Sequence, residues 1–282
     1  MKPLKRIIFT FIITCCLYFP YSTSGKAESS AEMVKGGSAC DMCDLRYQDF
    51  SKMDLDKISL RGAYLFNSKF ERTSLVGANL ESASIVLGNL KRADLTDAVL
   101  AKANLQKASM FGVTLRNANL RFARLVGANL EASELTNADL TSANLVDTVL
   151  TEAFADKVEF RSANMSNAQL VGTNLQGSKM EGVKLNSANL EKAKLVRAIL
   201  TNADLSGANL SNADLSYADL SGANLTRSTL VGAKLIGANL TGAVFNGANL
   251  SDAILSSALV FRADFCKAIL PEGALGKCIT NR

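Results

Sequence analysis

"TNADLSGANLSNADLSYADLSGANL", residues 201–225, consists of five near-copies of one five-residue word. A helix face repeats about every 3.6 residues and a strand face at every second residue. Neither period keeps the five leucines of this stretch on one side of the chain. The architecture must therefore be worked out from the repeat before any local propensity is considered.

The five-residue period continues far beyond this stretch. Every fifth residue from Leu45 to Leu270 is Leu, Ile, Met, Phe or Val, over 46 positions with the single exception of Ala155. Alanine stands two residues before the large residue in 31 of these words, and Asn or Asp stands directly before it in 22. The same five-residue pattern thus governs residues 41–270. In each word it places a large and a small residue in the interior of the fold, with a polar residue between them in the sequence.

Glycine marks the turn of each word. Of the 19 glycines, 13 lie directly before the small residue, where a positive φ costs glycine little. Asn and Asp also favour turns, through hydrogen bonds from their side chains to nearby backbone. Each word therefore predicts one short extended side and one corner. Four corners of about 90° close a square, and successive squares would pair as parallel strands about 4.8 Å apart.

The words ADLSG, ANLSN, ADLSY and ANLTG resemble the A(D/N)LXX word of the pentapeptide repeat proteins. The resemblance covers residues 41–270 and implies an all-β fold, a right-handed quadrilateral parallel β-helix. Its handedness comes from the resemblance and not from the period. About 11–12 coils would form a rod roughly 55 Å long.

The chain divides into four segments. A basic start, an apolar run over residues 7–19 and a small-x-small site at residues 25–27 predict a secretory signal peptide at 1–27. A membrane anchor is the alternative, although the run is short for a bilayer span. A lipoprotein modified at Cys15 is a weaker one. Residues 28–40 are expected to form a linker or cap, 41–270 the solenoid and 271–282 a C-terminal cap.

Export would change the charge of the chain and set its compartment. The full chain carries +5, but loss of four basic residues with the leader leaves 27 basic and 26 acidic residues. A near-neutral surface that carries both positive and negative charges offers no basic stripe to bind nucleic acid and no acidic stripe to imitate nucleic acid. We expect a periplasmic or extracellular protein, or one of the thylakoid lumen if the source is photosynthetic, with no membrane insertion after cleavage.

Four cysteines remain after the leader, in two close pairs at opposite ends of the repeat: Cys40 with Cys43, and Cys266 with Cys278. A rod of roughly 55 Å keeps the two pairs apart. Cys266–Cys278 would close the tail over the last coil, whose open edge could otherwise pair with another chain. Cys40 and Cys43 have redox-motif spacing, but no α/β pattern surrounds them, so a structural disulfide is favoured over a redox site. A zinc site shared by two chains is a third interpretation.

No enzyme is indicated. The chain has no histidine and no tryptophan, so the commonest general base and metal ligand is absent. No catalytic, cofactor-binding or metal-binding residues are predicted. An enzyme that used carboxylates on the face of the solenoid would need a pair of them on neighbouring coils. Nothing in the sequence distinguishes such a pair from acidic residues that are simply exposed to solvent. The expected function is a structural or protein-binding scaffold whose partner is an unidentified protein, a second copy included. The alternative is a topoisomerase-binding DNA mimic, which the resemblance implies for some members, but it requires an acidic surface and no export.

Two departures from the regular word stand out. Ala155 replaces the large residue beside Phe154, and Val158 stands in the small position of the next word. These departures suggest either a compensated exchange of volumes or a bend or groove. The position after the large residue, followed every twentieth residue, forms an apolar stripe in the first half of the rod. Its members are Phe66, Val86, Val126 and Val146, interrupted by Gln106. Apolar stripes on exported proteins often mark partner surfaces, although β-branched residues also suit strands.

Overall fold

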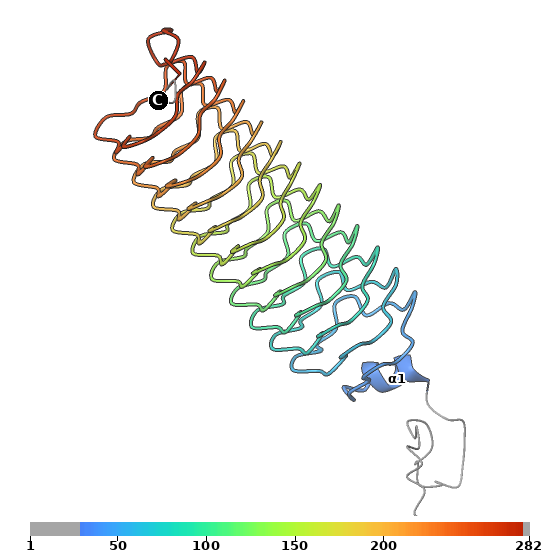
Figure 1. The fold of residues 1–282 in the computed structure, drawn as a ribbon. Coiled ribbons are helices and arrows are strands. Elements are labelled where there is room, and N and C mark those ends of the chain that lie inside the picture. The colour runs from blue at the N-terminus through green and yellow to red at the C-terminus, as the bar shows by residue number, and fades with distance from the viewer. Residues whose placement is uncertain (1–28, 279–282) are drawn as a thin grey trace, which may run out of the picture.

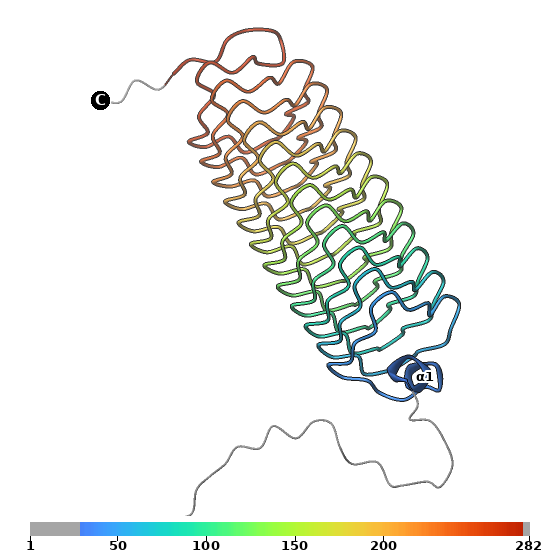
Figure 2. The same ribbon diagram turned by 90° about the vertical axis from the view of Figure 1, so that its right-hand side faces the viewer.

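Residues 41–270 wind into a four-sided coil that repeats along a straight rod (Figure 1 and Figure 2). The computed structural model describes residues 29–278, so the expected leader at 1–27, with Cys15, lies outside the described residues. Within them one helix, α1 (Ser30–Lys35), precedes the first coil, and the coils pair through single bridges instead of long strands. Residues 29–278 contain no helix with the length and apolar character of a membrane span.

The register between coils is constant. Parallel backbone bridges join each outward residue to the residue twenty places later, from the Asp44–Tyr64 pair to the Asn249–Ile269 pair. Twenty residues contain four words, so each coil has four sides. The prediction of a four-sided parallel β-helix is therefore confirmed.

Every word turns through the same backbone conformation. The N–H of the small residue donates to the carbonyl of the large residue three places earlier, as Ala103 does to Leu100 at 3.0 Å; Cys43 and Val158 are the exceptions among the small-position residues from Cys43 to Ala268. The residue before the small one has a positive φ, for example 60° at Lys102 and 66° at Gly207. This pattern is that of a type II turn. The glycines thus mark the turn as expected, yet within residues 29–278 a further 33 non-glycine residues also adopt a positive φ.

Backbone pairing with the next coil stabilises these strained turns. The N–H of Lys102 donates to the carbonyl of Arg121 at 2.8 Å, and its counterparts in other words do the same. A left-handed conformation costs a non-glycine residue roughly 1–2 kcal/mol. The added hydrogen bond, worth about 1 kcal/mol, and the stacking of equivalent turns explain why glycine is used in only some words.

The core consists of the large and small residues of each word. The large residues are almost completely buried from Leu45 to Leu250, and within that range the small residues are so from Ile58 onward, whereas the small positions before Ile58 are only partly buried. Aromatic residues stack on their equivalents in the next coil, with ring centroids 5.2 Å apart for Phe50–Phe70 and 4.8 Å for Phe245–Phe265. Where a hydroxyl replaces the small alanine, it usually donates to a nearby backbone carbonyl. Ser133 donates to Leu130, three residues earlier, at 2.6 Å, and Thr173 donates to Leu150 of the preceding coil at 2.7 Å. The core therefore accommodates most of its Ser and Thr residues with a hydrogen bond, whereas the buried Ser178 hydroxyl has no partner among the described residues.

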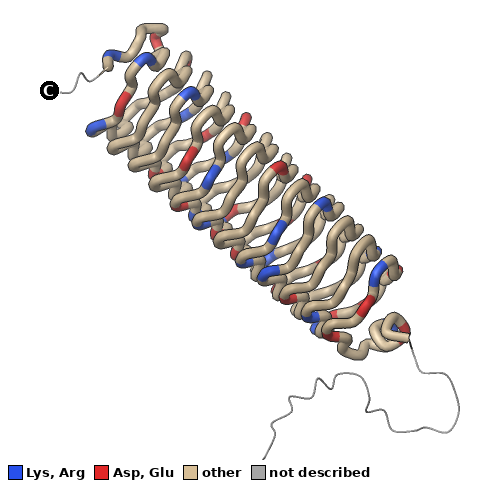
Figure 3. Tube along the Cα trace, turned by 45° about the vertical axis from the view of Figure 1, so that its right-hand side comes forward, with Lys and Arg blue, Asp and Glu red and all other residues tan. Residues whose placement is uncertain are grey.

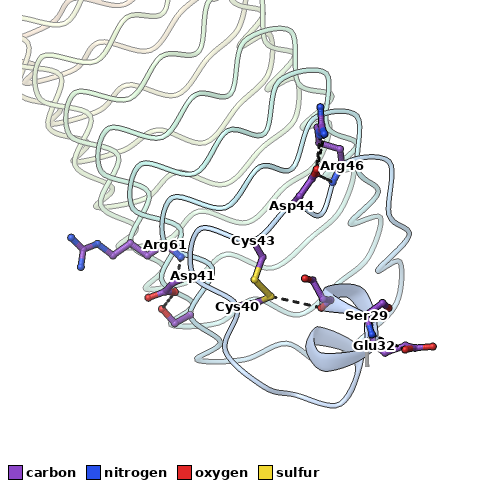
Figure 4. The surroundings of a disulfide bond; sticks show 10 residues. Ser29, Glu32, Cys40, Asp41, Cys43, Asp44, Arg46 and Arg61 are labelled. Carbon is purple, nitrogen blue, oxygen red and sulfur yellow. Dashed lines mark hydrogen bonds and ion pairs between the residues drawn. A yellow bond between two sulfur atoms is a disulfide. The ribbon is translucent and has the colours of Figure 1, made fainter. Parts of the chain in front are cut away.

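The N-terminal end is closed by α1. Ser29 and Glu32 form a capping box, in which each side chain accepts a hydrogen bond from the other's backbone N–H (Figure 4). Val34 is completely buried against the first coil. The sequence prediction described residues 28–40 as a linker or cap and did not include a helix. The Ser-x-x-Glu spacing at residues 29–32 was the signal that could have revealed it.

The C-terminal end is covered on one side of the square. The tail turns at Gly273, whose φ is 81°, and runs back antiparallel to residues 266–270 through the Ile269–Leu275 bridge. Its hydrogen bonds join Leu270 to Ala274 at 2.8 Å and Ala268 to Gly276 at 2.8 Å. Up to Cys278 the tail therefore lies along this side alone, because the chain reverses at Gly273.

Candidate protein-binding surface

The word fixes which side chains can reach a partner. The large and small residues point into the core, while the two turn residues and the outward residue of each side form the surface. We define the Phe66 corner as the turn between the sides that hold Leu65 and Phe70, together with the equivalent turns every twenty residues along the rod. The apolar stripe predicted from the sequence lies on this corner.

The structure places all four stripe residues on the Phe66 corner, on successive coils except where Gln106 intervenes. Phe66, Val86, Val126 and Val146 are half-buried there. The first turn residue is partly covered by the neighbouring coils, so it offers less surface than its outward position in the word suggested. These residues form a narrow apolar band and not a broad exposed face.

More exposed apolar side chains extend the band near the N-terminal end. Tyr47 and Leu87 occupy the second turn position of the same corner, with 65% and 44% of their surface exposed, and Tyr64 on the adjoining side is 50% exposed. The rings of Tyr47 and Phe66 meet edge to face, with centroids 5.5 Å apart. We call Tyr47, Tyr64, Phe66, Val86 and Leu87 the N-terminal apolar cluster.

Sequence reasoning missed Tyr47, Tyr64 and Leu87 as surface candidates because it followed only the first turn position. The second turn position is exposed in most words and usually holds Lys, Arg, Asn, Ser, Asp or Gly. A large apolar residue there is the signal that could have identified Tyr47 and Leu87.

A charged edge borders the cluster. Arg46 donates to Asp44 from Nε at 2.8 Å and from Nη2 at 2.6 Å. These hydrogen bonds lower the pKa of the Asp44 carboxyl below its ordinary value. With Tyr47 and Gln48, the pair lines a shallow hollow of about 330 Å³. A polar edge around an exposed aromatic centre is the usual composition of a protein interface.

Some acidic residues on the sides pair with basic neighbours. Glu159 contacts Lys179 at 2.6 Å and also pairs with Arg161, which reaches Glu181 at 3.2 Å. Carboxylates held in this way are structural charges and not free acid–base pairs. Among residues 29–278, no group of three His, Cys, Asp or Glu side chains is arranged to hold a metal ion.

Asp139 is the partly buried carboxylate whose titration the structure shifts. Burial alone would raise its pKa, but hydrogen bonds from Thr141 and Arg121 outweigh burial and leave the pKa below its ordinary value. The contacts are 2.9 Å from the Thr141 N–H and 3.0 Å from Arg121 Nη1. Asp139 is therefore ionised in the folded chain at neutral pH and contributes to its charge pairing.

The irregular word at Ala155 places its aromatic residue on the surface. Phe154 points outward and is 55% exposed, whereas Ala155 and Val158 are completely buried. The Phe154 ring therefore cannot fill the space left by Ala155, so a compensating gain in core volume would have to come from Val158, which holds the small position of the next word. With Arg116, Glu134, Thr136 and Asp156, Phe154 lines a shallow hollow of about 440 Å³.

Both cysteine pairs form disulfides. Cys40 and Cys43 are joined beside the first coil, with Cα atoms 5.5 Å apart, and the Cys40 sulfur lies 3.8 Å from the Ser30 carbonyl of α1 (Figure 4). Cys266 and Cys278 are joined across the C-terminal tail. The first disulfide fixes the loop after α1 to the solenoid, and the second fixes the tail to the last coil.

A family model for pentapeptide repeats matches the chain with 8 copies, over residues 43–82, 88–117, 114–151, 143–182, 163–202 and 223–265. The chain belongs to the pentapeptide repeat family. Its solenoid is accordingly the right-handed quadrilateral β-helix of such proteins. No curated protein matches the chain.

Solved structures of pentapeptide repeat proteins resemble it. HetL, involved in heterocyst differentiation regulation in the cyanobacterium Nostoc sp. strain PCC 7120, is 27% identical over 86% of this chain and 96% of its own, with a TM-score of 0.40. A protein of the Arabidopsis thaliana thylakoid lumen is 30% identical over 43% of this chain and 83% of its own, with a TM-score of 0.27. QnrB1, a plasmid-mediated fluoroquinolone resistance protein, is 14% identical over 79% of this chain and 90% of its own, with a TM-score of 0.32.

Proposed function

We propose that this pentapeptide repeat protein is an exported, non-enzymatic scaffold that binds a protein partner through the Phe66 corner. The observation that carries the proposal is the N-terminal apolar cluster, in which Tyr47, Tyr64 and Leu87 are exposed beside half-buried Phe66 and Val86. Exposed aromatic residues with a polar edge are typical of the centre of an interface.

The straight rod supports a scaffolding role. The turns of the Phe66 corner follow one another at one coil spacing, so a partner could contact several coils without any change in the shape of the rod. Lys and Arg are interspersed with Asp and Glu along the tube (Figure 3). This mixture does not favour the alternative of a topoisomerase-binding DNA mimic, which needs a predominantly acidic surface.

Export is supported by the leader-like residues 1–27 and by two disulfides, which persist in oxidising compartments. The compartment is tested by cell fractionation and N-terminal sequencing. We expect a mature chain that begins near Glu28 in the periplasm, the medium or the thylakoid lumen. A chain that retains its leader in the cytoplasm would contradict export, and a lipid on Cys15 would establish the lipoprotein alternative.

The binding surface is tested by cross-linking in the native cell. The double variant Tyr47→Ser, Leu87→Ser should lose the cross-linked partner that the native chain captures, because both side chains lie in the exposed part of the cluster. The matched control is Tyr217→Ser, which removes a side chain that is 61% exposed on another corner. If the double variant and the control retain the same partner, the Phe66 corner is not the interface.

A further inference from the structure

Within residues 29–278 three phenylalanine side chains are exposed, and two of them are covered by a cation of the same chain. The Arg121 guanidinium lies over the Phe122 ring, 5.6 Å from its centroid. Arg262 lies over Phe261 in the same way, at 5.1 Å. Phe154 is 55% exposed, yet no Lys or Arg of residues 29–278 lies over its ring. Since the face of an aromatic ring attracts cations, this ring is available to a cation from another molecule.

The hollow beside Phe154 carries more negative than positive charge. We call it the Phe154 hollow, and its other lining residues are Arg116, Glu134, Thr136 and Asp156. Arg116 is held by Glu134, to which its Nε donates at 2.7 Å. Asp156 accepts a hydrogen bond from Thr136 Oγ1 at 2.8 Å and forms no ion pair with a Lys or Arg of residues 29–278. Asp156 is therefore the carboxylate that an incoming cation would reach.

The backbone holds the ring and this carboxylate in a fixed relation. Phe154 and Asp156 are the outward residue and the first turn residue of one word, with only buried Ala155 between them. The Phe154 N–H donates to the Ser133 carbonyl at 2.9 Å, and the Phe154 carbonyl accepts from the Leu135 N–H at 2.7 Å. Groups that are already held in place lower the entropic cost of binding a ligand.

We propose that the Phe154 hollow binds an arginine side chain of a partner protein. The guanidinium would stack on the exposed face of Phe154 and donate hydrogen bonds to Asp156. Arginine is favoured over lysine because its planar group stacks on aromatic rings and presents paired donors to a carboxylate. The chain itself uses arginine at its two other exposed phenylalanines. The hollow is shallow, which suits a charged side chain that stays partly hydrated more than a small molecule that needs an enclosed pocket.

The Phe154 hollow is separate from the N-terminal apolar cluster. Arg116, Thr136 and Asp156 occupy the first turn position of one corner on three successive coils. This corner is two words away from the Phe66 corner around the coil, so it lies diagonally opposite on the square. The proposal therefore does not depend on binding through the Phe66 corner, and either surface can fail its test without the other.

The proposal is tested by NMR titration of the purified full chain with a capped peptide in which one arginine is flanked by glycines. We expect a Kd in the millimolar range, which is usual for a single side chain. The arginine CH₂ protons should shift upfield, because they would lie in the shielding region above the Phe154 ring. The matched peptide carries citrulline, an uncharged isostere of arginine, and should show neither binding nor the shift.

Three variants locate the contact. Phe154→Leu keeps an apolar side chain without an aromatic face, so it should raise the Kd about two- to fivefold, the range of a cation–π contact at an exposed site, and abolish the upfield shift. Asp156→Asn removes the charge at constant size and should raise the Kd by a similar factor, as for an exposed ion pair. Phe122→Leu is the control and should leave the Kd unchanged, because Arg121 already covers that ring. Circular dichroism establishes that all three variants retain the fold.

Several results would overturn the proposal. One is the absence of any shift with the arginine peptide at about 20 mM, and another is equal binding of the citrulline peptide. Unchanged affinity in Phe154→Leu or in Asp156→Asn, or an equal loss in Phe122→Leu, would place the contact elsewhere. A lysine peptide that binds more tightly would contradict the choice of a guanidinium. Self-association of the chain that Phe154→Leu abolishes would assign the hollow to a second copy and not to a partner protein.

Discussion

Leu210→Ala should destabilise the rod strongly, because Leu210 lies in the most regular part of the core. Its side chain is completely buried, between the equivalent Leu190 and Leu230 of the adjacent coils. The substitution removes three carbon atoms, and at about 0.8 kcal/mol for each buried CH₂ the lost transfer energy is roughly 2.4 kcal/mol. The residual cavity brings the expected loss to about 3 kcal/mol, within the usual range of about 2–5 kcal/mol.

The matched control is Leu255→Ala, the same change in the last coil. Leu255 is half-buried because no coil follows it on that side, so we expect less than half the loss seen at Leu210. The assay is guanidinium unfolding followed by far-UV circular dichroism, with the slope of the transition compared among the three proteins. A loss below about 1 kcal/mol at Leu210, or equal losses at the two positions, would refute the idea that stacking between neighbouring coils determines the cost.

Three further predictions follow from the ends, the charges and the turns. Replacing Cys266 and Cys278 by serine should lower the free energy of unfolding by about 2–4 kcal/mol and release the tail, detected as faster amide exchange at the tail; unchanged exchange would contradict this role. The folded pKa of Asp139 is depressed, so its contribution to stability is present above the unfolded pKa of about 3.9 and is lost as pH falls through the folded value. The Asp139→Asn variant should therefore lose less stability than the native chain in this acid range. Identical acid unfolding of the two proteins would exclude the effect. Gly276→Ala should displace the tail, because a Cβ there would clash with the Phe265 carbonyl oxygen. The control Gly242→Ala meets no atom within 4 Å and should lower the free energy of unfolding only by the roughly 1–2 kcal/mol of a left-handed alanine. Equal melting temperatures for the two variants would argue against this difference.

Much of the fold could be predicted from the sequence because the repeat imposes one environment on each position of the word. The large residues and the alanines had to share one interior, and four turns had to close each coil. The confirmed four-sided β-helix and the membership of the pentapeptide repeat family both follow from that regularity. The turn at the glycine position could also be predicted from the sequence, because glycine adopts the positive φ found at Gly207 without a steric penalty.

The surface and the ends were decided by the tertiary structure. The exposure of a turn residue depends on the coils that stack above and below it, which is why Phe66 is half-buried while Leu87 is open. Phe154 could not be assigned to the core or the surface until the direction of its side chain was known. At the ends, where the repeat stops, a local signal such as the capping box of α1 or the turn at Gly273 does not say how much of the square the segment will cover. That coverage depends on the path of the chain in space, because hydrogen bonds between coils are satisfied only where another segment actually lies alongside.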